Sequence, residues 1–280
     1  PHRKPGTDQA GKTHAQYIRN MIDLTYIRGF YPPQIANNAN FQKHLLKEYI
    51  ECLAMEWISQ SAWSDKLAFI EGTNLRLIQG IDRFSEDLDF DCKNLSQEDF
   101  IHMTDGLMRY LTLQGLTVKP RDKENPNLTA FRRNVYFPEL LFSLQLTAHR
   151  EERFLMKIEA QDQGIVYPRE MATISRLGFY FPVPVPPVSI LLSMKLSALL
   201  TRQKGRDFYD VLFLWQRTKP EYEFLKQRHG IENKEQLLVQ LQETVTHTDL
   251  KTKQRDFEHL LFEPRKSEQI LHFMEILTSS

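Results

Sequence analysis

The sequence has little cysteine and no net charge. Two thiols, Cys52 and Cys92, cannot build a disulfide framework, so we expect reduced thiols and a cytoplasmic protein. Lysine and arginine together number 36, as do aspartate and glutamate, and this balance excludes a broadly basic nucleic-acid binder. Because 41% of the residues are hydrophobic, a disordered chain is excluded as well. Any attraction for phosphate must therefore come from local clusters of charge.

The sequence also lacks an apolar run that is fit to cross a membrane. The charge-free stretch 177–194 has about the required length, but four prolines interrupt it. We interpret it as a strand, an extended proline-rich connector over 183–188, and the start of a helix. The sequence contains no His-Glu-x-x-His motif and no cysteine pair with zinc spacing, so it predicts no zinc site.

Hydrophobic periodicity predicts an α+β fold. Helical spacing marks 41–59, and Ser96 with Asp99 three residues later predicts a capped helix that ends at Leu113. After the prolines, we expect a helix from Ser189 to Arg202 and another that begins at Asp207. Strands are expected at 66–71, 88–90, 116–118, 128–135, 140–147 and 154–160, with 128–135 and 140–147 paired to each other.

The same pattern predicts three parts of the chain. We expect a helical extension over 1–40, an α/β domain over 41–187 and a helical domain over 188–280. The proline-rich connector is the best boundary between the last two, because mixed elements precede it and only helical patterns follow it.

Two carboxylates stand close together on the strand near residue 88. Residues two apart on a strand point to the same face, so Asp87 and Asp89 lie side by side. Like charges this close disfavour joint ionisation unless a cation lies between them. Magnesium suits such a pair, because it is usually held by one or two carboxylates together with substrate phosphates. A solvated strand face is the plainer alternative, and Asp91 continues the same alternation.

A glycine turn precedes these carboxylates. Gly72-Thr73 lies between a predicted strand and a predicted short helix. A glycine at this place lets a phosphate approach the backbone, and the N–H groups at a helix start attract it.

The helix after the prolines presents basic side chains on one face. Lys195 and Arg202 lie seven residues apart, and Asp207 and Asp210 share a face of the next helix. These residues are either an ion-pair network that pins two helices or part of a phosphate site. In the second case one aspartate orients Lys195; spacing alone does not decide which, and we favour Asp210.

Taken in order, these stretches resemble the AbiEii/AbiGii toxin family of nucleotidyltransferases, within the DNA polymerase β-like superfamily. The resemblance covers about residues 41–216 and departs at Glu71, where the family usually has the first of two glycines. Four segments carry it: Gly72-Thr73, Arg83-Phe84-Ser85-Glu86-Asp87-Leu88-Asp89-Phe90, Met156-Lys157-Ile158-Glu159-Ala160, and Lys195 to Arg202 with Arg206 to Asp210.

The resemblance implies a polymerase β-like mixed sheet with flanking helices, followed by a helical C-terminal domain. It implies Mg²⁺ or Mn²⁺ held by Asp87, Asp89 and Glu159, with Glu159 either a metal ligand or the general base. The residues it implies for nucleotide binding are Gly72, Thr73, Ser85, Lys195, Arg202 and Asp207, and those for catalysis are Asp87, Asp89, Glu159, Lys195 and Asp210.

The activity implied is that of a toxin in an abortive-infection type of toxin–antitoxin system, as used in phage defence. A nucleotide from an NTP would pass to an acceptor such as tRNA or another RNA, with release of pyrophosphate, and a cognate antitoxin would neutralise the toxin. Two alternatives stay open: an inactive nucleotidyltransferase fold that acts through a protein partner, which Glu71 favours, and a metal-dependent phosphoesterase.

Overall fold

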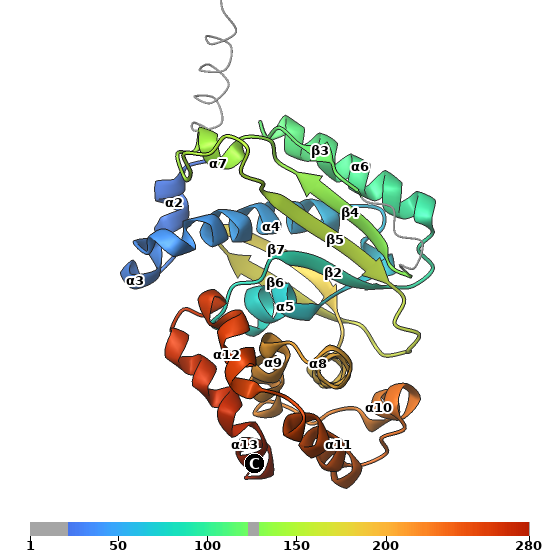
Figure 1. Cartoon of the computed structure of the whole chain (residues 1–280). Helices are drawn as coiled ribbons and strands as arrows, with labels where there is room; N and C mark the ends of the chain where they lie inside the picture. Colours follow the sequence, from blue (N-terminus) through green and yellow to red (C-terminus); the bar gives the residue numbers. More distant parts are fainter. Residues whose placement is uncertain (1–21, 123–128, 280) are drawn as a thin grey trace, which may run out of the picture.

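A five-stranded mixed sheet forms the centre of the upper part of the molecule (Figure 1). The structure is a computed structural model, and it describes residues 22–122 and 129–279. The strand order is β1-β2-β5-β4-β3; β2 and β5 run parallel, and the other neighbours are antiparallel. The strands are β1 (Leu67–Ile70), β2 (Asp87–Cys92), β3 (Lys119–Pro120), β4 (Phe131–Tyr136) and β5 (Leu155–Gln161).

Two helices cover the face of the sheet that lies at the back in Figure 1. They are α4 (Gln42–Gln60) and α6 (Gln97–Leu113), and both were expected. The predicted capping box is confirmed, because Ser96 and Asp99 each accept a hydrogen bond from the other's backbone N–H. Leu88 and Phe90 are buried, whereas Asp87 and Asp89, which alternate with them, are half-buried. The alternation of β2 thus gives its apolar side to the core and leaves its carboxylates on the opposite face.

The prediction of a strand over 140–147 is wrong. Residues Leu140–Ser143 form the short helix α7, and β4 pairs with β3 and β5 instead. Leu140, Leu141 and Leu144 are buried together. Their spacing of one and four residues is helical, whereas Phe142 to Thr147 alternates apolar and polar residues as a strand does, so the local period indicated the wrong structure.

The structure also contains a β-hairpin outside the five-stranded sheet, and only its second strand was predicted. β6 (Glu170–Arg176) was not predicted, and it pairs along its whole length with β7 (Phe179–Val185). The predicted connector begins too early, because β7 continues through Pro182 and Pro184. Proline has no backbone N–H, and residues two apart on a strand direct this group toward the same edge. Because β7 pairs only with β6 in this two-stranded sheet, its other edge needs no N–H donors, and the strand tolerates both prolines.

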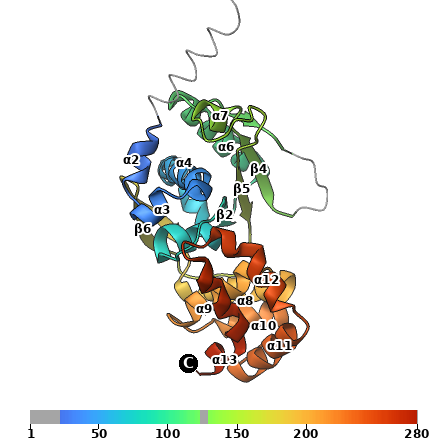
Figure 2. The same cartoon turned by 60° about the vertical axis from the view of Figure 1, so that its left-hand side comes forward.

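Helices and connecting loops make up the rest of the described chain. Directly after β1 lie α5 (Glu71–Asn74) and η3 (Leu75–Gln79), and η2 (Ser64–Lys66) precedes it. Figures 1 and 2 show the helices from α8 onward gathered below the five-stranded sheet. These are α8 (Val188–Arg202), α9 (Gly205–Trp215), α10 (Tyr222–His229), α11 (Lys234–Thr246), α12 (Leu250–Phe257), η4 (Glu258–Leu260), η5 (Pro264–His272) and α13 (Phe273–Thr278). Before α4 stand α2 (Leu24–Arg28), α3 (Pro33–Ala36) and η1 (Ala39–Phe41). The α+β class is confirmed, and the three-part division of the chain stays a prediction.

The predicted starts of two helices shift slightly. α8 begins at Val188 with Pro187 as its N-cap, rather than being capped by Ser189, and α9 already begins at Gly205.

Within the described ranges, we find no helix that is both long and apolar enough to cross a bilayer.

Candidate active site

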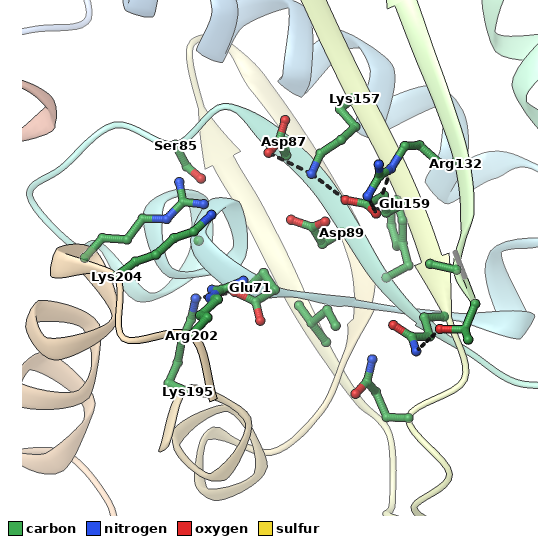
Figure 3. Close-up of a pocket in the computed structure, with 18 of the residues that line it drawn as sticks. Glu71, Ser85, Asp87, Asp89, Arg132, Lys157, Glu159, Lys195, Arg202 and Lys204 are labelled. Carbon is green, nitrogen blue, oxygen red and sulfur yellow. Dashed lines mark hydrogen bonds and ion pairs between the residues drawn. The ribbon is translucent and has the colours of Figure 1, made fainter. Parts of the chain in front are cut away.

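A polar cavity of about 420 Å³ lies between the carboxylate face of the sheet and α8. Figure 3 shows its two sides: Asp87, Asp89 and Glu159 project from β2 and β5, and Lys195, Arg202 and Lys204 come from α8 and the turn after it. Most of the predicted site residues line this cavity. They are Gly72, Ser85, Asp87, Asp89, Glu159, Lys195 and Arg202.

The carboxylate of Asp89 has no direct partner among the described residues, although the charge of Lys157 partly offsets it. Its side chain forms no hydrogen bond or ion pair with any residue in the described ranges. Burial, followed by repulsion from Glu71, raises the pKa of Asp89 to about 7, and Asp87 and Glu159 add to the effect. The carboxylate therefore lies where a cation would stabilise its ionised form.

Glu159 is adjacent to Asp89 across the parallel β2–β5 pair, but it bonds to other groups. Arg132 donates two hydrogen bonds to it, at 2.9 and 2.6 Å, and Lys157 donates another. Burial raises the pKa of Glu159, but these hydrogen bonds outweigh burial and hold the pKa below its usual value. The Lys157 ammonium also lies 3.1 Å from Asp87, so it bridges two of the three predicted metal ligands.

The donor set at this face fits a hard divalent cation in part. Among the described residues, no group of three or more His, Cys, Asp or Glu side chains is arranged to hold a metal ion. Asp87 and Asp89 nevertheless supply two carboxylates on one strand face, and no described residue forms an ion pair with Asp89. Magnesium is commonly held by one or two carboxylates and by substrate phosphates, which is the arrangement this pair allows.

The helical turn α5 (Glu71–Asn74), directly after β1, brings backbone close to the cavity. A Cβ atom on Gly72 would lie 2.6 Å from Ser85 Oγ and 2.9 Å from an Arg83 guanidinium nitrogen, so a side chain does not fit there. Thr73 is buried, and its hydroxyl donates to the Asp87 carbonyl. The structure thus places Gly72 and Ser85 at the cavity wall, whereas the Thr73 side chain hydrogen-bonds to the backbone of β2.

Glu71 occupies the position at which the family pattern has a glycine. Its φ is 63°, in the left-handed region that glycine adopts without strain. Its carboxylate accepts a hydrogen bond from Lys195 and lies 3.6 Å from the Arg202 guanidinium. Burial raises the pKa of Glu71, but these two cations outweigh burial and hold it below its usual value, so the group is ionised.

Lys195 and Asp210 belong to one buried network. Asp210 accepts two hydrogen bonds from Arg83, both at 2.7 Å, and lies 3.0 Å from the Lys195 ammonium. Burial raises the pKa of Asp210, but Arg83 and Lys195 reverse this effect and hold it at about 2. Of the two predicted aspartates, Asp210 therefore contacts Lys195, whereas Asp207 accepts bonds of 3.0 and 2.8 Å from Arg202.

Several cavity residues were not among the predicted site residues. Arg83 and Lys157 lie inside the motif segments, and Lys157 has the same strand parity as Glu159, so spacing was an available signal. Lys204 and Arg206 also line the cavity, and neither forms an ion pair with a described carboxylate.

Residues 6–13 have the spacing Gly-x-x-x-x-Gly-Lys-Thr of a phosphate loop. They lie outside the residues that the structure describes.

Comparisons with known proteins give the site its context. No curated protein matches the sequence. The solved structure of MenT4, a nucleotidyltransferase toxin from Mycobacterium tuberculosis H37Rv, is similar with a TM-score of 0.57 and 14% identity, over 91% of this chain and 99% of that one. JHP933 from Helicobacter pylori aligns with a TM-score of 0.49 and 17% identity, over 84% of this chain and 92% of that one.

The match to a protein-family model is more informative. The likeness to MenT4 concerns the fold alone, because the identity is low. The model described as "Nucleotidyl transferase AbiEii toxin, Type IV TA system" matches residues 53–276, which include the helices after residue 216. The chain therefore belongs to the AbiEii family of nucleotidyltransferase toxins.

Proposed function

We propose that this toxin transfers a nucleotide from an NTP to a hydroxyl group of an RNA, with tRNA as the expected acceptor, and releases pyrophosphate. The observation that carries the proposal is the cavity itself. Asp89, whose carboxylate forms no ion pair within residues 22–122 and 129–279, faces a group of cations that includes Lys195, Arg202 and Lys204. A polyphosphate needs both sides of such a cavity, because its own charge must be matched by protein cations and by a bound metal.

The cations and the turn would hold the triphosphate. Lys195, held by Asp210, would bind the β- and γ-phosphates, and Arg202, held by Asp207, would add a second positive charge. Gly72 would let a phosphate approach the backbone, and Ser85 beside it would donate a hydrogen bond. Charge that develops on the leaving pyrophosphate would then be stabilised by groups that are already in position.

Asp87 and Asp89 would hold Mg²⁺ or Mn²⁺. When bound, the ion supplies positive charge to the phosphates and orients them for in-line attack. Glu159 would complete this ligand set or accept the proton of the attacking hydroxyl; in either role it must be released from Lys157 or Arg132.

We extend the proposal to partners and domains. Type IV toxin–antitoxin membership supports a cognate antitoxin encoded with the toxin. Lys204 and Arg206, at the turn that leads into α9, have no carboxylate partner among the described residues and suit an RNA backbone. The cavity lies where a sheet domain ending near residue 187 would meet a helical domain beginning at 188, the division expected from the sequence.

The test is a labelling assay. The toxin is incubated with total tRNA, Mg²⁺ and each α-labelled NTP, and the label is mapped on the RNA. Asp89→Asn should reduce transfer at least about a hundredfold, the scale of losing a group that stabilises developing charge. Asp256→Asn, which removes an equal charge from the exposed side of α12, should keep wild-type activity.

Three outcomes contradict the proposal. Full transfer by Asp87→Asn and Asp89→Asn would remove the metal assignment. Phosphate release without labelled RNA would favour a phosphoesterase. An absence of any Mg²⁺-dependent NTP binding in calorimetry would favour an inactive fold that acts through its partner.

A further inference from the structure

Glu71 closes the most buried part of the cationic side of the cavity. Its carboxylate accepts a hydrogen bond from Lys195 and lies 3.6 Å from Arg202, and its own side chain is 24% exposed at the cavity wall. Lys195 itself is only 3% exposed. An anion that approaches from the cavity therefore meets the Glu71 carboxylate on the way to the Lys195 ammonium.

Charge matching around this contact is complete without any ligand. Asp210 faces Arg83 and Lys195, and Asp207 faces Arg202. With Glu71 the connected cluster contains three cations and three carboxylates, namely Arg83, Lys195 and Arg202 against Glu71, Asp207 and Asp210. Without Glu71 the same cluster would carry one unmatched positive charge that faces the cavity.

The backbone at this residue is strained. A non-glycine residue is disfavoured in the left-handed region, because its Cβ comes too close to the following carbonyl oxygen. Glu71 has a φ of 63° and carries a long charged side chain there. The turn needs no side chain to form, since this conformation is the one glycine adopts freely. The contact with Lys195 is therefore what the side chain contributes to the site.

We propose that Glu71 is an internal anion that occupies the phosphate position on Lys195 and Arg202, and that an NTP must displace it to bind. This inference rests on the proposed function of the cavity. Glu71 would lower the affinity for NTP and for pyrophosphate, so the toxin would require a higher NTP concentration than it would with glycine at this position. The side chain would swing toward the open cavity when phosphate takes its place.

The test measures binding without catalysis. Calorimetry with inorganic pyrophosphate in the absence of metal, and with ATP·Mg²⁺ in the absence of RNA, is carried out on the wild-type protein and on Glu71→Gln. The amide keeps the size of the side chain but removes its charge. We expect Glu71→Gln to bind both probes about tenfold more tightly, which corresponds to about 1.4 kcal/mol. Glu71→Gly, which also relieves the backbone, should show the same gain and serves if the first variant folds poorly.

A matched control separates the local effect from net charge. Glu151→Gln removes one negative charge from an exposed residue outside the cavity, and it should bind both probes as the wild type does. An equal gain in Glu151→Gln would overturn the inference, because long-range charge would then explain the result.

The outcomes distinguish the inference from the proposed function. If the wild-type toxin binds ATP·Mg²⁺ and labels RNA, but Glu71→Gln binds pyrophosphate no more tightly, the inference is wrong and the proposed function stands. Weaker ATP·Mg²⁺ binding by Glu71→Gln would make Glu71 a metal ligand and would also overturn the inference. If neither protein binds ATP·Mg²⁺, both proposals fail.

Discussion

At the scale of single residues, the site depends on close approach between the turn and the strand that follows. Gly72 leaves room for Ser85 and for the buried guanidinium of Arg83, which in turn holds Asp210. The neighbouring Glu71 shows the opposite situation, because a side chain is present where the backbone favours none.

Gly72→Ala should damage the site through packing alone. The added methyl group would lie 2.6 Å from Ser85 Oγ, so Ser85 or Arg83 must move. We expect a loss of about 1–3 kcal/mol in the free energy of unfolding and a clear loss of NTP binding. Chemical denaturation and calorimetry measure the two effects. Gly80→Ala, whose Cβ would meet nothing within 4 Å but whose φ is 79°, should lose stability only and keep NTP binding.

At the scale of elements, buried ion pairs join α8 and α9 to the segment before β2. Asp210 on α9 holds Lys195 on α8 and Arg83 in that segment, and all three side chains are at most 3% exposed. The network fixes the distance between the helices and the sheet, and it also orients Lys195 toward the cavity (Figure 3).

Asp210→Asn should be strongly destabilising at neutral pH. It leaves Arg83 and Lys195 buried without their carboxylate, which typically costs about 3–5 kcal/mol. Urea denaturation of both proteins at several pH values tests this expectation.

The same comparison has a defined pH dependence. The pKa of Asp210 is about 2 in the folded protein, below the usual value of about 3.9 for an unfolded chain. Its ionised form therefore stabilises the fold fully above about pH 4, and this contribution is lost as the pH falls toward 2. The difference in stability between wild type and Asp210→Asn should shrink over that interval. A constant difference down to pH 2 would contradict the assignment.

At the scale of the whole molecule, the end of the chain supports the segment that carries the motif. The backbone N–H of Phe84 donates to the Leu260 carbonyl, and that of Phe262 donates to the Asp82 carbonyl. Between them, Arg83 and Leu261 form an isolated β-bridge, and Lys266 forms an ion pair with Asp82. The Phe262 ring packs on Phe84 at a centroid distance of 4.9 Å. Residues far apart in sequence thus hold Arg83 where it meets Asp210.

Phe262→Ala should weaken this support. The side chain is partly buried and lies 4.5 Å from the Arg76 guanidinium, so we expect a loss of about 2 kcal/mol in stability. RNA labelling should fall as well, because Arg83 and Ser85 are on the supported segment. Thermal unfolding and the labelling assay measure both changes. Val239→Ala, at an exposed position of α11, should change neither the unfolding temperature nor the labelling activity. Full labelling activity in Phe262→Ala would show that the contact between Phe262 and Phe84 is structural only.

Local pattern alone determined much of this protein. The alternation that places Asp87 and Asp89 on one face, the capping box at Ser96 and the α+β class follow from the spacing of neighbouring residues, which backbone geometry fixes. The same reasoning failed over 140–147. Phe142 to Thr147 alternates apolar and polar residues as a strand does, but Leu140–Ser143 form a helix, because in so short a segment tertiary packing outweighs the local period.

Only the tertiary structure decided how the charges pair. Spacing placed Asp207 and Asp210 on one helix face, but the packing of α9 beside α8 and the segment before β2 brought Asp210 to Lys195 and Arg83, and left Asp207 to Arg202. It likewise directed Glu159 to Arg132 on the neighbouring strand and brought Glu71 to Lys195. These pairs join residues up to 127 positions apart. Ion pairs depend on distances across elements, which short-range sequence patterns do not contain, whereas strand alternation depends only on the chain's own geometry.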